Sequence, residues 1–181
     1  MIELVGQIIG ILGTVIAVLS FQCKDNKKFF IWQAACGACF AANFMLIGNV
    51  TVAFLHFFNI VRAASFGFTK GRARGILAVA VVLMYTASTV LTFEGFSLAG
   101  IMAIAALAAQ IVGTTAMYLD NGRIIRVAQL SFISPVFLVN SIIPKFSLGG
   151  VLCEVFNLTS IAIALIRYRK SGFTSVNEKE S

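Results

Sequence analysis

Seven long apolar runs, separated by short polar breaks, are the feature that most constrains how this chain can fold. A helix needs about 20 apolar residues to cross the hydrocarbon core of a bilayer, and each run is close to that length. The runs are continuous rather than alternating, so they predict helices and not the strands of a membrane barrel. The predicted spans are Leu4–Gln22, Phe29–Ile47, Val50–Phe68, Gly75–Phe93, Ser97–Tyr118, Ile124–Ile143 and Ser147–Ile166.

The composition agrees with this interpretation. Of the 181 residues, 59% are hydrophobic and only 12% are charged, whereas soluble domains carry roughly 25% charged residues. A soluble chain of this size could not bury so much apolar side chain in one core. Composition therefore excludes a soluble domain, a disordered chain and a basic nucleic-acid-binding domain. We expect an all-α integral membrane protein whose partner is the lipid bilayer and not a nucleic acid.

The distribution of Lys and Arg predicts the orientation of these spans. Positive charge near the ends of spans marks the cytoplasmic side of a membrane. With the N-terminus outside and the C-terminus inside, 12 of the 14 basic residues fall on that side. They are Lys24, Lys27, Lys28, Lys70, Arg72, Arg74, Arg123, Arg126, Arg167, Arg169, Lys170 and Lys179. Of the remaining two, Lys145 falls outside and Arg62 within the third span, where we expect it to reach toward the inner headgroups rather than to bind substrate.

The two ends of the chain resemble each other, which indicates an internal repeat. The segment Asp25-Asn26 enters the second span as Asp120-Asn121 enters the sixth, and several intramembrane polar residues recur at nearly the same spacing. The offsets between partners are 95, 97 and 98 residues. The corresponding intramembrane pairs are Asn43 with Asn140, His56 with Glu154, and Asn59 with Asn157.

The repeat predicts a 3+1+3 architecture. Two three-helix units separated by one helix enter the membrane in the same direction, so they are parallel repeats. We expect a first repeat over residues 1–68 and a linker loop and helix over 69–94. A second repeat then covers 95–170, and a disordered cytoplasmic tail covers 171–181.

Short motifs along nearly the whole chain resemble those of the bacterial YgjV-type inner membrane proteins. The motifs are Gly6-Gln7-Ile8-Ile9-Gly10, the Phe21…Asp25…Phe29 connection, Phe58-Asn59-Ile60-Val61-Arg62, and the basic end from Ile166-Arg167-Tyr168 onward. The 3+1+3 order is also similar to the SWEET sugar transporters of the PQ-loop (MtN3-like) superfamily. That wider resemblance implies alternating access by two rocking units, with asparagines of the third and seventh spans facing each other across a substrate pocket. Asn59 and Asn157 match those positions.

The chain departs from the SWEET pattern elsewhere. The PQ signature survives only as Phe21-Gln22, and the prolines are only Pro135 and Pro144. The pocket tryptophans are also missing, since Trp32 is the only tryptophan. The resemblance therefore does not carry sugar specificity over to this chain.

The residues themselves point to the same place. Asn59 and Asn157 lie in the middle of their spans, at the depth where secondary transporters bind substrate. His56 and Glu154 lie three residues earlier and share the same helix faces, so we expect them to pair with each other. Glu154 is the only acidic residue deep in any span, and such residues usually face a cavity or a partner.

A substrate site is therefore predicted from seven residues: Asn59, Asn157, His56, Glu154, Asn43, Asn140 and Gln110. A purely structural role, in which these groups only hydrogen-bond neighbouring helices, is the alternative for each of them. It is the favoured interpretation for Gln110.

These observations predict a secondary transporter or facilitator that moves a small polar metabolite across the bacterial inner membrane by alternating access. A non-transporting membrane receptor or scaffold of the same fold is the alternative. An enzyme is disfavoured because no nucleophile, phosphate-binding loop or metal-ligand set accompanies His56 and Glu154. We expect no cofactor and no bound metal. Coupling to protons through His56 and Glu154 and assembly into a homo-oligomer are both left open by the sequence.

Overall fold

The computed structural model describes residues 2–91, 93, 95–143 and 146–176, and within them the chain is built from helices. The helices are α1 (Ile2–Phe21), α2 (Asn26–Leu46), α3 (Val50–Phe68), α4 (Gly71–Leu91), α5 (Leu98–Tyr118), α6 (Gly122–Ala128), η1 (Gln129–Ile133), α7 (Ser134–Ile142) and α8 (Leu148–Arg167). Lys145, which was predicted to fall on the outer side of the membrane, and Pro144 lie outside the described residues.

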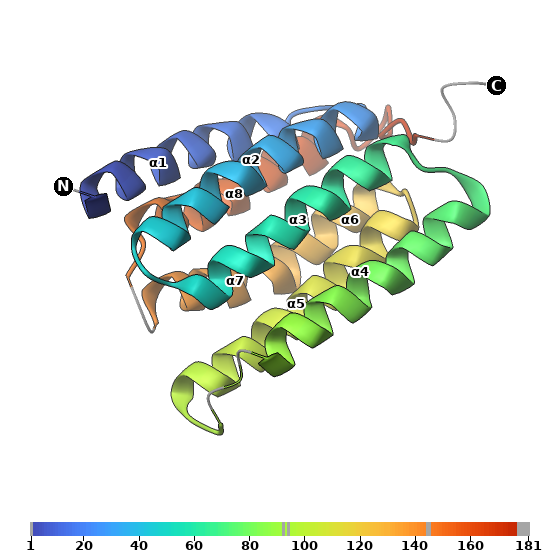
Figure 1. The fold of residues 1–181 in the computed structure, drawn as a ribbon. Helices are drawn as coiled ribbons and strands as arrows, with labels where there is room; N and C mark the ends of the chain where they lie inside the picture. Colours follow the sequence, from blue (N-terminus) through green and yellow to red (C-terminus); the bar gives the residue numbers. More distant parts are fainter. Residues whose placement is uncertain (1, 92, 94, 144–145, 177–181) are drawn as a thin grey trace.

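Successive helices run back and forth along one bundle axis (Figure 1). The helices α1, α2 and α3 pack side by side in chain order, and α8 lies against α1. On the other side, α5 packs against α6, η1 and α7, and these contact α8. The helix α4 packs against α3 and α5. The middle of the bundle is therefore surrounded by α1, α2, α3, α5, α8 and the continuous path formed by α6, η1 and α7, and α4 lies outside them.

Several helices begin at a side-chain cap that the apolar pattern did not reveal. Asp25 accepts from the backbone N–H of Lys27, and Asn121 accepts from those of Arg123 and Ile124. These caps satisfy backbone donors that the first turn of a helix leaves free. Consequently α2 starts at Asn26 rather than at the predicted Phe29, and α6 starts at Gly122 rather than at Ile124.

The sixth span is a single path of three pieces. Between α6 and α7, the segment η1 is a π-helix of five residues. A π-helical turn inside an α-helix arises where one extra residue is accommodated without breaking the helix. The span predicted over residues 124–143 is thus continuous, with one local irregularity in its first half.

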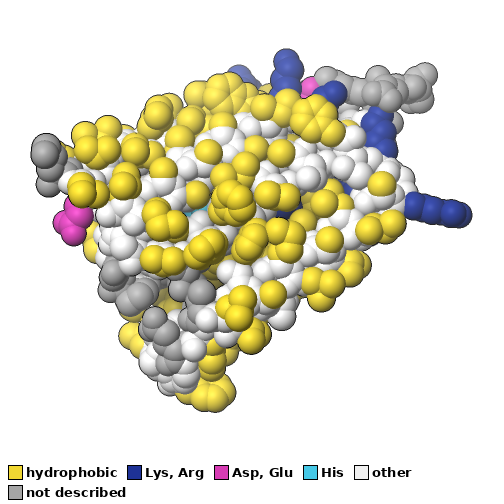
Figure 2. All heavy atoms as spheres, in the orientation of Figure 1, with side chains coloured by type: hydrophobic (Ala, Val, Ile, Leu, Met, Phe, Trp, Pro, Cys, Tyr) yellow, Lys and Arg dark blue, Asp and Glu magenta, His cyan; other side chains and the backbone are white. Residues whose placement is uncertain are grey.

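Among the described residues, six helices are long and apolar enough to cross a membrane, with Gly122–Ile142 counted as one, and α3 contributes a shorter apolar helix, Val52–Phe68. The outer surface explains the composition, because large apolar side chains cover much of it (Figure 2). Lys and Arg side chains gather toward one end of the molecule in the same view. We call this end, where the connections α1–α2, α3–α4 and α5–α6 meet residues 168–176, the basic end.

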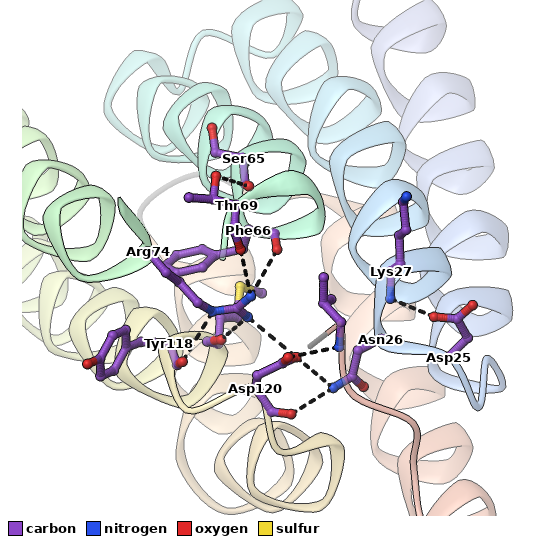
Figure 3. A network of polar contacts seen from close by, with 11 residues as sticks. Asp25, Asn26, Lys27, Ser65, Phe66, Thr69, Arg74, Tyr118 and Asp120 are labelled. Carbon is purple, nitrogen blue, oxygen red and sulfur yellow. Dashed lines mark hydrogen bonds and ion pairs between the residues drawn. The ribbon is translucent and has the colours of Figure 1, made fainter. Parts of the chain in front are cut away.

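A buried polar network joins four parts of the chain at the basic end (Figure 3). Arg74 of α4 forms an ion pair with Asp120 at 3.4 Å and donates to the main-chain carbonyls of Phe66, Thr69, Met117 and Tyr118. Asn26 donates to the main-chain carbonyl and the carboxylate of the same Asp120. The span predicted to start at Gly75 therefore begins earlier, because Arg74 is buried in the helix rather than exposed in a loop.

The segment after α8 makes hydrogen bonds and packing contacts as far as Val176, where the sequence predicted a disordered tail from residue 171 onward. Thr174 pairs with the α1–α2 connection through two backbone hydrogen bonds, to Lys24 and from Asn26. Val176 is buried and its N–H donates to Asp120. Residues 177–181 lie outside the described part of the chain. The sequence pattern missed this segment because it has no apolar run, although Val176 joins the same buried apolar cluster as Phe21 and Phe29.

Candidate functional site

A cavity of about 60 Å³ lies among the helices that surround the middle of the bundle. Side chains from α1, α2, α3, α5, η1, α7 and α8 line it, and α4 contributes none of its lining residues. A volume of this size has room for several water molecules, but a drug-sized ligand occupies roughly 300 Å³ or more. The structure therefore describes a small cavity to which every helix except α4 and α6 contributes.

The cavity brings together five of the seven predicted site residues. These are Asn59, Asn157, His56, Glu154 and Gln110, from three different helices. The helices α3 and α8 begin at residues 50 and 148, the same offset of 98 that separates Asn59 from Asn157. The two asparagines therefore lie at the same position along their helices. His56 and Glu154 lie one turn farther from the basic end.

The other two predicted residues, Asn43 and Asn140, are not among the residues that line the cavity. Asn43 of α2 donates to the Gly6 carbonyl of α1, and Asn140 of α7 donates to the Met102 carbonyl of α5. Asn43 thus ties α2 to α1, and Asn140 ties α7 to α5. In this structure both therefore make helix–helix contacts, and their assignment to the substrate site stays a prediction.

His56 is surrounded by aromatic rings. Its imidazole stacks on Phe44 with ring centroids 5.3 Å apart, and Phe40 and Phe137 lie 5.4 and 6.0 Å away. Among the described residues, no ion pair joins His56 to Glu154. The expected direct pair is therefore not formed, because Phe rings occupy the positions beside the imidazole. Glu154 instead has Ser134 and Asn157 as its side-chain neighbours.

Arg62 lines the cavity, although the sequence predicted that it reaches toward the inner headgroups. It does not reach toward the basic end. Its side chain is buried and lines the cavity. The guanidinium donates to Asn59, to the Gln110 carbonyl and to the Thr114 hydroxyl. The Tyr85 ring lies 5.5 Å from its central carbon. Only neutral groups therefore contact this charge directly.

Two glutamines were also missed. Gln33 of α2 and Gln129 of η1 line the cavity, and each donates to a serine, Ser20 and Ser134 respectively. They are 96 residues apart, close to the repeat spacing. Aligning the second span with the sixth at the repeat spacing would have identified both glutamines as candidates.

The cavity concentrates buried polar atoms that have no hydrogen-bond partner. Eight such side-chain atoms occur among the described residues, and four of them belong to cavity residues. The four are His56 Nδ1, Arg62 Nε, Glu154 Oε2 and Asn157 Oδ1. A buried polar group without a partner costs free energy, so native structures leave few of them. Their clustering at one cavity is the arrangement expected of a site that a polar ligand completes.

The described residues offer no group of three His, Cys, Asp or Glu side chains placed to hold a metal ion. Cys36 and Cys153 line the cavity, whereas Cys39 of the C-x-x-C pair packs near Gly13 of α1. The polar groups of the cavity are thus suited to hydrogen bonding and ion pairing with a small molecule.

Comparison with known proteins gives one match. The family model of the bacterial inner membrane protein YgjV matches residues 4–172. No curated protein and no solved structure gives a significant match. The family, the membrane-spanning helices and the apolar outer surface agree with the predicted location. The chain therefore belongs to the YgjV family and is a multi-pass protein of the bacterial inner membrane.

Proposed function

We propose that the chain is a secondary transporter or facilitator that carries a small polar metabolite across the inner membrane. The observation that carries this proposal is the cavity in the middle of the bundle, lined from every helix except α4 and α6 and bordered by four buried polar atoms without partners. Midplane cavities between structural units are where secondary transporters hold their substrates.

The proposal includes two parallel repeats, α1–α3 and α5–α8, joined by α4. Corresponding residues of the two units line the same cavity, as Asn59 and Asn157 do, and Asn43 and Asn140 make equivalent bonds. The π-helix η1 supports the alignment. An extra residue there raises the repeat offset by one, and the offset rises from 96 at Gln33 and Gln129 to 97 at Asn43 and Asn140.

Alternating access follows if the two units rock against each other. Toward the basic end the cavity is lined by Phe21 and Met117, which belong to a buried apolar cluster. At the other end, α1 and α8 approach closely at Gly10 and Gly149. We propose that substrate enters when one of these contacts opens. The orientation with the basic end in the cytoplasm and the placement among SWEET-like proteins are part of the same proposal.

Uptake into proteoliposomes tests the function. Purified protein is reconstituted and exposed to a panel of labelled sugars, amino acids, vitamins and nucleosides. The wild type should accumulate at least one solute, and Asn59→Ala and Asn157→Ala should each reduce that uptake strongly. Asn121→Ala, at an exposed helix cap outside the cavity, is the control and should transport normally. Normal uptake by both cavity variants would remove the site from the proposal.

A non-transporting receptor or scaffold is the second candidate, and the small volume of the cavity favours it. A receptor needs a ligand pocket but no path through the membrane. It predicts ligand-dependent stabilisation of the purified protein with no flux into proteoliposomes.

A further inference from the structure

Two opposite charges border the cavity without being paired to each other or to any other charged group. Arg62 has no carboxylate within ion-pair distance among the described residues, and Glu154 has no basic partner there. Besides Arg62 and Glu154, the lining contains the imidazole of His56, which can also carry a charge. Isolated charges at membrane depth are costly, so they are usually compensated by a partner or by function.

The unpartnered atoms of Arg62, Glu154 and Asn157 are complementary in kind. Arg62 Nε is a donor without an acceptor, whereas Glu154 Oε2 and Asn157 Oδ1 are acceptors without donors. The cavity therefore lacks an anionic acceptor beside Arg62 and a donor beside Glu154. One ligand that carries both groups satisfies all three atoms at once.

The register of α3 and α8 places the two charges at different levels of the cavity. Glu154 corresponds to position 56 of α3, so six residues separate its level from that of Arg62. Six residues correspond to about 9 Å along a helix axis. The Arg62 guanidinium reaches back to Asn59, one turn nearer the level of Glu154, so the two charged groups lie closer together than their backbone levels. That separation requires a compact molecule.

From this geometry we propose that the cavity selects a small zwitterion of the amino-acid type. Its carboxylate binds Arg62 and its ammonium group binds Glu154 and Asn157. This inference rests on the proposed function and adds the class of substrate. An arginine guanidinium presents several donors in a planar fork, which matches a carboxylate. The zwitterion carries no net charge, and the small volume of the cavity favours glycine, alanine or serine over larger amino acids.

Ligand-induced stabilisation of the purified full-length protein tests this inference. The probes are glycine, L-alanine and L-serine, together with propionate and ethylamine, which each keep only one charged group of alanine. At least one of the three amino acids should raise the melting temperature. Propionate and ethylamine should bind at least about tenfold more weakly, because each loses a charge-assisted hydrogen bond.

Two variants assign the charged groups separately. Arg62→Gln should bind ethylamine about as well as alanine, because the carboxylate no longer contributes. Glu154→Gln should likewise bind propionate about as well as alanine. A general loss of packing would weaken all probes together and would not produce these two opposite changes in selectivity. Should one variant fail to fold, the other still tests its own half of the site.

The outcomes separate the inference from the proposed function. If none of the three amino acids binds the wild type, the inference is wrong. It is equally wrong if an uncharged solute is transported through Asn59 and Asn157 and Arg62→Gln transports it normally. If an amino acid binds with the expected selectivity but is never transported, the substrate class stands and the transport function fails.

Discussion

The side-chain amide of Asn26 donates to both the main-chain carbonyl and the carboxylate of Asp120, each at 3.1 Å. Asn26 lies at the start of α2 and Asp120 precedes α6, so the bond joins the two halves of the chain. Both residues belong to the Asp-Asn motif that occurs in each half. Asp120 also carries the ion pair with Arg74 of α4. This one carboxylate thus connects both proposed repeats to the linker helix at the basic end.

Arg74→Ala should destabilise the protein, by about 3 kcal/mol, because it removes the ion pair to the buried Asp120 carboxylate and the donor to four main-chain carbonyls. Thermal unfolding in detergent measures the effect. Arg72→Ala is the matched control, since Arg72 lies on the exposed side of the same helix end and exposed charges contribute little. Equal melting temperatures for the two variants would contradict the structural role of Arg74.

Arg126→Ala should also lower the melting temperature by several degrees. This fully buried guanidinium donates to the carbonyls of Phe21, Cys23 and Gly122. Removing it leaves buried carbonyls without donors, at a cost of about 1–3 kcal/mol for each group that finds no other partner. Arg123→Ala, three residues earlier and exposed, should unfold like the wild type. A stable Arg126→Ala would show that water or another donor replaces the guanidinium.

Gly149→Ala should separate α1 from α8. A Cβ atom at this position would lie 2.6 Å from the carbonyl carbon of Gly10, which is backbone and cannot rotate away. Overpacking of this kind costs about 1–3 kcal/mol, and it should appear as a lower melting temperature. The control is Gly75→Ala, where the nearest atom, on the Tyr118 ring, is 3.7 Å away. That variant should be as stable as the wild type or slightly more stable, because alanine favours the helix.

The proposed orientation predicts which ends of the helices reagents can reach. In a chain whose four cysteines are replaced by serine, single cysteines are introduced as Arg72→Cys at the basic end and Phe96→Cys at the other end. A membrane-impermeant maleimide should label Phe96→Cys from outside the inner membrane. It should label Arg72→Cys only after that membrane is permeabilised. The reverse pattern would invert the orientation.

The sequence predicted the helical class and the approximate limits of the spans, because apolar runs of membrane length permit little else. It also predicted Asn59, Asn157, His56 and Glu154 as cavity residues, since they combine polarity, depth and repeat spacing. The helix starts were shifted because capping by Asp25 and Asn121 depends on local backbone geometry. Apolar periodicity does not report such capping.

Which polar residues reach the cavity was decided only by the tertiary structure. A helix that is apolar all round gives no pattern to tell its lipid face from its inner face. Thus Arg62 lines the cavity, while Asn43 and Asn140 bond neighbouring helices. Arg74 and Arg126 likewise fit the charge rule for topology, yet they are buried at the basic end. Sequence determined that these charges lie near the ends of the helices, and packing determined that main-chain carbonyls and Asp120 surround them.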